Sequence, residues 1–154
     1  MEFEYLADRP QDVSKVIAWW RTEWGSRMGS DIKSLETQLR KSLSKSELPI
    51  HIIATIDGNA VGTAALKLQE VAELFPDNHY WLGSVFVDEQ HRGNRIASKL
   101  SKRIVELAKE KGLPHLYLQT IDLRGGLYAK LGWEPIREFN YKEEQTLLML
   151  KKLS

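Results

Sequence analysis

Three stretches of the chain carry apolar residues at the spacing of an amphipathic helix, in which positions i, i+3, i+4 and i+7 share one face. The first follows a proline-containing turn at residues 8–10 and has an apolar stripe from which Trp19 departs. The second is predicted to begin at Ser30 or Asp31, because either side chain can accept a hydrogen bond from the first helical turn. The third helix is predicted over residues 96–111. The apolar stripe of the first helix consists of Val13, Val16, Ile17, Trp20 and Trp24.

Strands are predicted between these helices from short runs of β-branched and apolar residues. A hairpin is predicted over residues 50–68, because Asp57-Gly58 joins two such runs and glycine adopts a positive φ without steric strain. The strand predicted at residues 80–87 contains Gly83, which indicates a bulge or the close approach of another group. The remaining predicted elements are a strand at residues 3–7, a strand at 116–121, a short helix that ends at Gly132, and strands at 134–141 and 145–151.

These elements follow the order β-α-α-β-β-β-α-β-α-β-β in a single predicted domain, residues 1–154. A chain of this length buries a core without disulfides or metals, and an apolar content of 42% excludes disorder. The sequence has no cysteine, which excludes thiolate metal sites and cysteine nucleophiles. The four histidines never stand four residues apart, so no metal site is predicted.

The formal net charge of +1 provides no overall attraction to nucleic acid or to a membrane surface, and neither partner is expected. No apolar run reaches the length of a membrane-spanning helix, and the first residues lack the pattern of a signal peptide. We therefore expect a soluble, cytoplasmic protein.

The candidate chemistry centres on a basic turn between the strand at residues 80–87 and the third helix. Backbone amides at such a turn and helix start point in one direction, and the helix dipole adds positive potential, so the arrangement can bind phosphate. Between Gln90 and Val105 the chain has five cations and no acid: Arg92, Arg95, Lys99, Lys102 and Arg103. From the residues alone, an ordinary turn with a solvated basic face stays an equal alternative, since the glycine fingerprints of nucleotide folds are absent.

The segment Arg92-Gly93-Asn94-Arg95-Ile96-Ala97 resembles motif A of the GNAT superfamily of N-acetyltransferases, Gln/Arg-x-x-Gly-x-Gly/Ala. Arg92 and Ala97 match the motif, whereas Arg95 stands where the family usually has glycine. A second segment, Leu127-Tyr128-Ala129-Lys130-Leu131-Gly132-Trp133, resembles the family's Leu-Tyr-x-Lys-Leu-Gly-Phe segment. Together with the order of elements, the resemblance covers nearly the whole chain.

The resemblance implies an α/β (α+β) fold, the GNAT fold, with a central mixed, twisted sheet of six to seven strands flanked by about four helices. It implies an N-acetyltransferase that moves an acetyl group from acetyl-CoA to a primary amine by direct attack in a ternary complex. A non-catalytic acyl-CoA-binding or regulatory protein with the same fold is the main alternative, and a nucleotide- or RNA-binding module is a third. The implied acceptor is a small-molecule or protein amine. The resemblance also allows the protein to form a homodimer.

By the same resemblance, coenzyme A is bound by the central strand and the basic turn. Tyr128 is then the general acid that protonates the departing thiolate; the alternative is a core tyrosine whose hydroxyl is satisfied within the protein. Backbone amides near Val85 to Val87 are the expected oxyanion donors. The predicted cofactor-binding residues are Val85, Phe86, Val87, Arg92, Gly93, Asn94, Arg95, Ile96, Ala97, Ser98 and Tyr128.

The general base and the acceptor pocket are less constrained by the sequence. Family members often place a carboxylate or a water-holding polar group just before the central strand, which makes Glu73 the first choice as base, with Asp77 and His79 as alternatives. A water chain without a dedicated base is a further alternative. In the family the first two helices and their loop cover the acceptor, which makes Trp19, Trp24 and Met28 the predicted substrate-binding residues.

Overall fold

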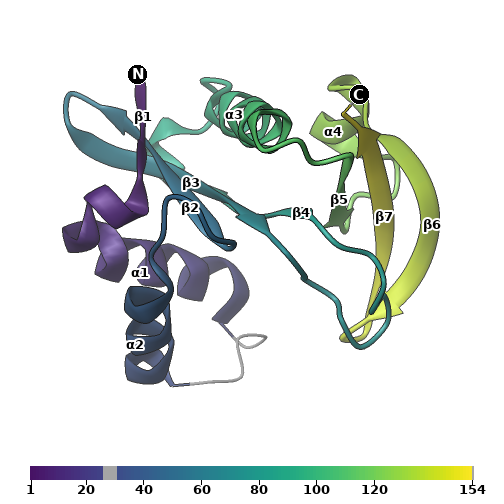
Figure 1. Cartoon of the computed structure of the whole chain (residues 1–154), viewed down its shortest axis with the longest axis horizontal. Coiled ribbons are helices and arrows are strands. Elements are labelled where there is room, and N and C mark those ends of the chain that lie inside the picture. Colours follow the sequence, from purple (N-terminus) through teal and green to yellow (C-terminus); the bar gives the residue numbers. More distant parts are fainter. Residues whose placement is uncertain (26–30, 154) are drawn as a thin grey trace.

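The computed structural model describes residues 1–25 and 31–153, and it contains one seven-stranded sheet with helices on both faces (Figure 1). The observed order of helices and strands confirms the order expected from the sequence. The elements are β1 Glu2–Tyr5, α1 Val13–Trp24, α2 Ile32–Ser42, β2 Ile50–Ile56, β3 Asn59–Lys67, β4 Trp81–Val87, α3 Ile96–Glu110, β5 His115–Thr120, α4 Gly126–Lys130, β6 Glu134–Tyr141 and β7 Glu144–Lys152, with 3₁₀ turns at Leu6–Asp8, Pro10–Asp12 and Glu89–His91.

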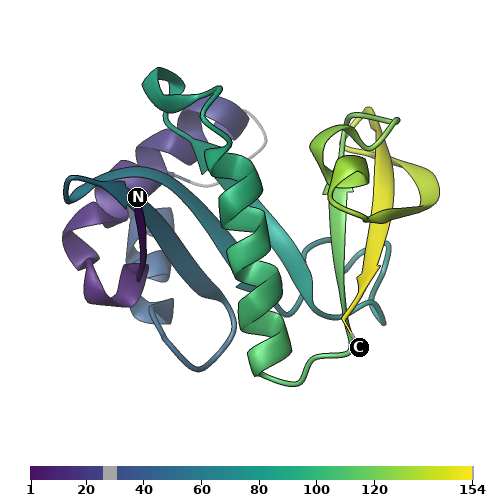
Figure 2. The same cartoon turned by 90° about the horizontal axis from the view of Figure 1, so that it is seen from above.

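The strands lie in the order β1-β2-β3-β4-β5-β7-β6, in which β4 and β5 are parallel and the other described neighbours are antiparallel. In the described chain, β4 and β5 pair at a single position, Trp81 with Tyr117, where the Tyr117 amide donates to the Tyr80 carbonyl at 2.9 Å. Beyond this point the two strands diverge, and β5, β6 and β7 stand apart from β4 (Figure 2). The rest of β4 therefore has a partner strand on one side only.

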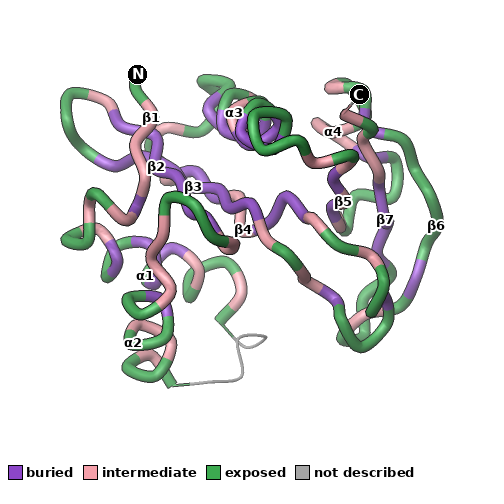
Figure 3. The backbone as a smooth tube through the Cα atoms, in the orientation of Figure 1, coloured by how far each residue is buried: buried purple, intermediate pink, exposed green. Residues whose placement is uncertain are grey.

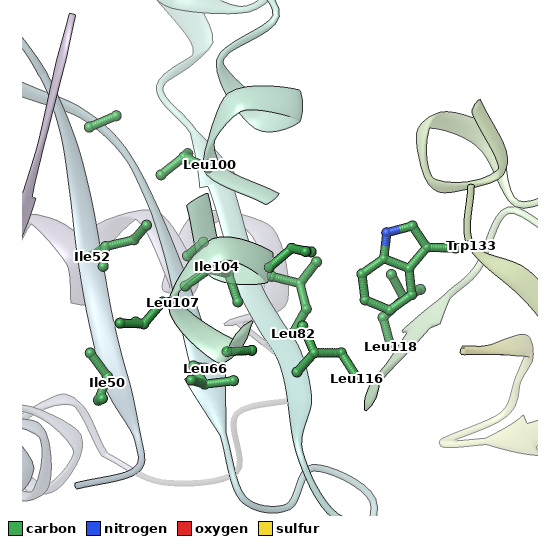
Figure 4. Close-up of a cluster of buried hydrophobic side chains, with 14 of the residues drawn as sticks. Ile50, Ile52, Leu66, Leu82, Leu100, Ile104, Leu107, Leu116, Leu118 and Trp133 are labelled. Atoms are coloured by element: carbon green, nitrogen blue, oxygen red, sulfur yellow. The ribbon is translucent and has the colours of Figure 1, made fainter. Parts of the chain in front are cut away.

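Helix α3 crosses one face of the sheet between β4 and β5 and holds the two parts together. Leu100 and Ile104 of α3 are fully buried over the first part of the sheet. Leu116 and Trp133 bring the second part into the same apolar cluster (Figure 4). Burial is deepest along β2 and β3, whereas the edge strand β6 is largely exposed (Figure 3).

Helices α1 and α2 cover the opposite face of the sheet (Figure 1). The stripe of α1 is buried at Val13, Val16 and Ile17, as predicted. Trp19 is also buried, with 8% of its surface exposed, although the sequence pattern places it outside the stripe. Helix α2 begins as expected, because the Asp31 side chain accepts a hydrogen bond from the Ser34 amide at 2.8 Å.

The strand β4 contains the bulge that Gly83 suggested. Gly83 pairs with Ala65 and Phe86 pairs with Thr63, so two residues of β4 face one residue of β3. The backbone irregularity falls on Ser84, whose φ is 54°, and not on the glycine itself. An extra residue in one strand bends it and turns its backbone groups away from the regular ladder.

Candidate functional site

The basic turn presents a run of open backbone amides at the start of α3. The N–H groups of residues 93–98 have no hydrogen-bond acceptor in the described part of the chain. The first amide of the helix that is paired belongs to Lys99, which donates to the Arg95 carbonyl at 3.0 Å. Gly93 and Arg95 have left-handed φ values of 88° and 60°, which curl the turn. Open amides at the positive end of a 15-residue helix form an anion-binding concavity.

Three cations of the turn, Arg92, Arg95 and Lys99, have different surroundings. The Arg92 Nε donates to the Val87 carbonyl at 3.0 Å, and its guanidinium lies over the Phe86 ring at 5.2 Å, so this side chain braces the turn. Arg95 and Lys99 are exposed and have no ion pair or side-chain hydrogen bond in the described chain. Arg95 holds a left-handed conformation, which accounts for a glycine preference at this position of the motif.

A continuous stack of side chains joins α1 to this turn. The Lys15 ammonium lies 5.5 Å from the Trp19 ring centre, and Trp19 stacks on Phe86 with ring centres 5.7 Å apart and an interplanar angle of 22°. Phe86 in turn carries the Arg92 guanidinium on its ring. Trp19 therefore lies under the turn and contacts it through Phe86.

A cavity of about 410 Å³ opens beside the unpaired edge of β4. It is lined by the β4 bulge, by β5, by the end of α1 and by the turn between β6 and β7. Val85 and Tyr128 both line it, so the bulged strand and the candidate acid face one space. Since the described part of β5 does not pair with this stretch of β4, strand-type hydrogen bonds are open to a ligand there.

Tyr128 is largely buried, and its environment keeps the phenol protonated. Its ring packs edge-on against Trp133, with ring centres 6.2 Å apart. Burial raises the pKa of Tyr128 above its ordinary value of 10.0; the Ser101 hydroxyl partly offsets this, and the charge of Glu70 raises the pKa further. A phenol that remains protonated at neutral pH can donate a proton to a leaving group.

Glu70 is a cavity residue that the sequence did not single out. Its Oε1 accepts a hydrogen bond from Gln119 Nε2 at 3.0 Å, whereas its Oε2 is buried and has no partner in the described chain. The carboxylate lies against Gly83: a Cβ at that position would be 2.1 Å from Glu70 Oε2. The absence of a side chain at Gly83 thus allows the close approach that the sequence indicated, and the group that approaches is the Glu70 carboxylate.

The sequence-derived site residues have different positions in the structure. Trp24 lines the cavity, whereas Trp19 does not reach it because its ring is stacked on Phe86. Glu73 is exposed on a surface turn and is not among the cavity-lining residues. Met28 lies outside the described residues.

Within the ranges 1–25 and 31–153, no helix combines the length and apolar character needed to cross a membrane. The same residues contain no cluster of three or more side chains of the kinds that hold metal ions.

The model of the acetyltransferase (GNAT) family matches residues 14–133 of this chain. The Uncharacterized N-acetyltransferase YobR of Bacillus subtilis (strain 168) is 30% identical over 69 residues, which are 43% of this chain and 28% of that protein. The Probable N-acetyltransferase camello of Xenopus tropicalis is 28% identical over 102 residues, which are 64% of this chain and 45% of that protein. The matched region therefore spans less than half the length of either relative.

Solved structures share the fold at low sequence identity. The aminoglycoside 6'-acetyltransferase type Ii gives a TM-score of 0.77 at 17% identity, covering 100% of this chain and 98% of that one. The ribosomal-protein-alanine N-acetyltransferase from Brucella melitensis gives 0.77 at 18% identity, covering 99% and 100%. An aminoglycoside 6'-N-acetyltransferase complexed with coenzyme A gives 0.75 at 15% identity, covering 100% and 98%. At these identities the likeness shows the fold and not the acceptor.

Proposed function

Because this chain belongs to the acetyltransferase (GNAT) family, we propose that it transfers an acetyl group from acetyl-CoA to a primary amine by direct attack in a ternary complex. The observation that carries the proposal is the convergence of three features on one path. Open amides lie at the start of α3, the edge of β4 lacks a partner in the described chain, and a partly buried phenol faces the same cavity. A long ligand with a diphosphate at one end and a thioester at the other fits this order.

The residues present fit the donor. The amides of residues 93–98 would hold the diphosphate, with the cations of Arg95 and Lys99 beside them. The open edge of β4 at Val85–Val87 would hydrogen-bond the amides of the pantetheine arm, as an added strand does. Arg92 would act differently from the other two cations, because it is already engaged with Val87 and Phe86.

In the proposed reaction the amine nitrogen forms a bond to the carbonyl carbon, and the bond from that carbon to sulfur breaks. Glu70, in place of the exposed Glu73, accepts the proton that the ammonium must lose before attack, directly or through a water. Backbone N–H groups at the Val85 bulge stabilise the developing oxyanion. Tyr128, which its raised pKa keeps protonated, gives its proton to the departing thiolate, and the phenolate is reprotonated by the second proton that the nitrogen loses as the amide forms.

Two measurements test the proposal. Acetyl-CoA is expected to raise the melting temperature of the protein and to bind in calorimetry. With a panel of amines, the protein is expected to catalyse the release of free thiol from acetyl-CoA, at a rate that depends on the amine. Binding without thiol release from any amine would favour the alternative of a non-catalytic acyl-CoA-binding protein, and stabilisation by RNA or a nucleotide alone would refute both.

The variant Tyr128→Phe tests the proposed acid. It removes the hydroxyl but keeps the ring against Trp133, so kcat should fall about 10- to 100-fold while the Kd for acetyl-CoA stays within about twofold. Tyr5→Phe in β1, whose residue does not line the cavity, is the matched control and should keep the wild-type kcat. An unchanged kcat in Tyr128→Phe would refute the assignment.

A further inference from the structure

We infer that the acceptor is a small amine that also carries a carboxylate, as a free amino acid does. This inference rests on the proposed function and specifies its acceptor. It comes from the charges of the cavity wall beside the β4 bulge, where an acid and a base flank Gly83 without forming an ion pair with each other in the described chain.

The acid and the base reach Gly83 from the same segment of chain. Glu70 Oε2 lies 2.1 Å, and Lys67 Cδ 3.3 Å, from the position that a Gly83 Cβ would take. Both residues line the cavity. Neither the ammonium of Lys67 nor the Oε2 of Glu70 has a hydrogen bond or an ion pair within the described residues.

The Lys67 charge lies near the buried ring of His51. Burial lowers the pKa of His51 to about 3, and the positive charge of Lys67 adds to that effect, which places the ammonium near a buried and neutral ring. Lys67 itself is half-buried, and a charge at the wall of a cavity is attracted to a ligand anion more strongly than a fully solvated lysine is. A ligand carboxylate would supply that anion.

The remaining charges of the cavity support the same acceptor. Glu23 and Lys142 also line it, so the wall carries two acids and two bases in all. A polycation would be attracted by the two acids but repelled by the two lysines of the same wall, and a simple amine would satisfy Glu70 but leave Lys67 uncompensated. An amino carboxylate satisfies both charges that flank Gly83.

The size and the aromatic walls limit the rest of the molecule. A volume of about 410 Å³ has to hold the acetyl end of the donor as well as the acceptor, and ligand pockets of about 300–1,000 Å³ hold small molecules. Trp24 and Tyr141 line the cavity and offer flat apolar surfaces. We therefore expect an amino acid with an apolar side chain to be accepted before a charged one.

The experiment compares matched amines in the thiol-release assay with acetyl-CoA. L-Leucine is compared with 3-methylbutylamine, which lacks the carboxylate, and with L-leucinamide, whose carboxylate is replaced by a neutral group. L-Phenylalanine and phenylethylamine form a second pair, and an aminoglycoside represents polycations. The expected kcat/KM is about 10- to 100-fold higher for each amino acid than for its counterparts, the usual effect of a charged hydrogen-bond partner. Leucinamide controls for basicity, because its amine loses a proton more readily than that of leucine.

Lys67→Gln is the diagnostic variant. It should lower kcat/KM for L-leucine about tenfold or more, mainly through KM, and leave 3-methylbutylamine and the Kd for acetyl-CoA unchanged. Lys45→Gln, which changes an exposed lysine that does not line the cavity, is the control.

Four results would overturn the inference. If leucinamide or the aminoglycoside matched L-leucine, or if Lys67→Gln slowed all amines equally, the carboxylate would have no role and the N-acetyltransferase proposal would still stand. If no amine of the panel released thiol although acetyl-CoA bound, the acceptor class and the catalytic proposal would both fail.

Discussion

Replacing Gly83 by alanine is predicted to disable the proposed base without unfolding the protein. The added Cβ would lie 2.1 Å from Glu70 Oε2 and 3.0 Å from its Cδ, whereas ordinary contacts begin at 3.4 Å. The oxygen must therefore retreat by about 1.3 Å, the difference between 3.4 and 2.1 Å. That movement also disturbs the 3.0 Å hydrogen bond from Gln119 Nε2 to Glu70 Oε1.

The effect on stability should be small because the displaced atoms are the end of a flexible side chain. Loss of the Gln119 hydrogen bond destabilises by about 1 kcal/mol, and replacing glycine by alanine within a strand returns about 0.5–1 kcal/mol. The effect on the reaction should be large, since a displacement of about 1 Å can lower a rate about 100-fold, equivalent to about 2.7 kcal/mol in the barrier.

The measurements are kcat from thiol release, the Kd for acetyl-CoA from calorimetry, and the melting temperature. Gly83→Ala should lower kcat about 100-fold and leave the other two nearly unchanged. Gly25→Ala is the matched control, because the nearest atom to its added Cβ is 4.0 Å away. In the background of Glu70→Gln, the alanine should have little further effect. A Gly83→Ala protein that keeps more than a third of the wild-type kcat, or an equal loss in both backgrounds, would refute the role of Glu70.

Three further predictions concern the turn and the core. Arg95→Gly should raise the free energy of unfolding in urea by about 0.5–1 kcal/mol, because φ at this position is 60°; a loss of stability would contradict the strain. The pKa of His51 is lowered to about 3, so the unfolded chain alone binds this proton between pH 6.5 and 3. Stability should therefore decrease as the pH falls below 6.5, by about 2 kcal/mol at pH 5, and His51→Leu should abolish that component. Trp19→Leu should weaken acetyl-CoA binding through Phe86 while Trp19→Phe restores it; equal binding by both would exclude this coupling.

The order of elements was predictable because each helix and strand has its own apolar period and most end at a glycine or a charged turn. The site was predictable where it depends on backbone geometry, as in the turn that starts α3. Trp19 shows the limit of periodicity. A helix packed on a sheet buries a stripe wider than one row of side chains, so two adjacent tryptophans can both contact the sheet. Which of them meets Phe86 depends on how α1 is placed over β4.

The reason why we propose Glu70 and not Glu73 as the base is different, and it lies in the conformation of an irregular loop. The Phe75 amide donates to the Val71 carbonyl at 2.8 Å, which closes a tight turn, and the side chains of Val71 and Phe75 are buried beneath it. Glu73 lies within that turn and is exposed to solvent. Glu70 precedes the turn and stays near the sheet. Loops of this kind carry no repeating pattern, so the choice of Glu73 over Asp77 and His79 could not be checked against a periodicity, and nothing in the sequence pointed to Glu70.

The divergence of β4 and β5 also has a mechanical consequence. In the described chain the two parts are joined by one backbone bond between β4 and β5, by the apolar side chains beneath α3, by the hydrogen bond from Gln119 to Glu70, and by a second apolar cluster that includes Phe75 and Phe139. Beyond that backbone bond, where the cavity opens, the described parts of β4 and β5 form no strand pairs. A ligand that contacts both β4 and β5 there would connect the two strands. Amide hydrogens of β5 should therefore exchange with solvent more slowly once acetyl-CoA is bound. Bound acetyl-CoA would then connect the two parts of the sheet and make them more rigid relative to each other.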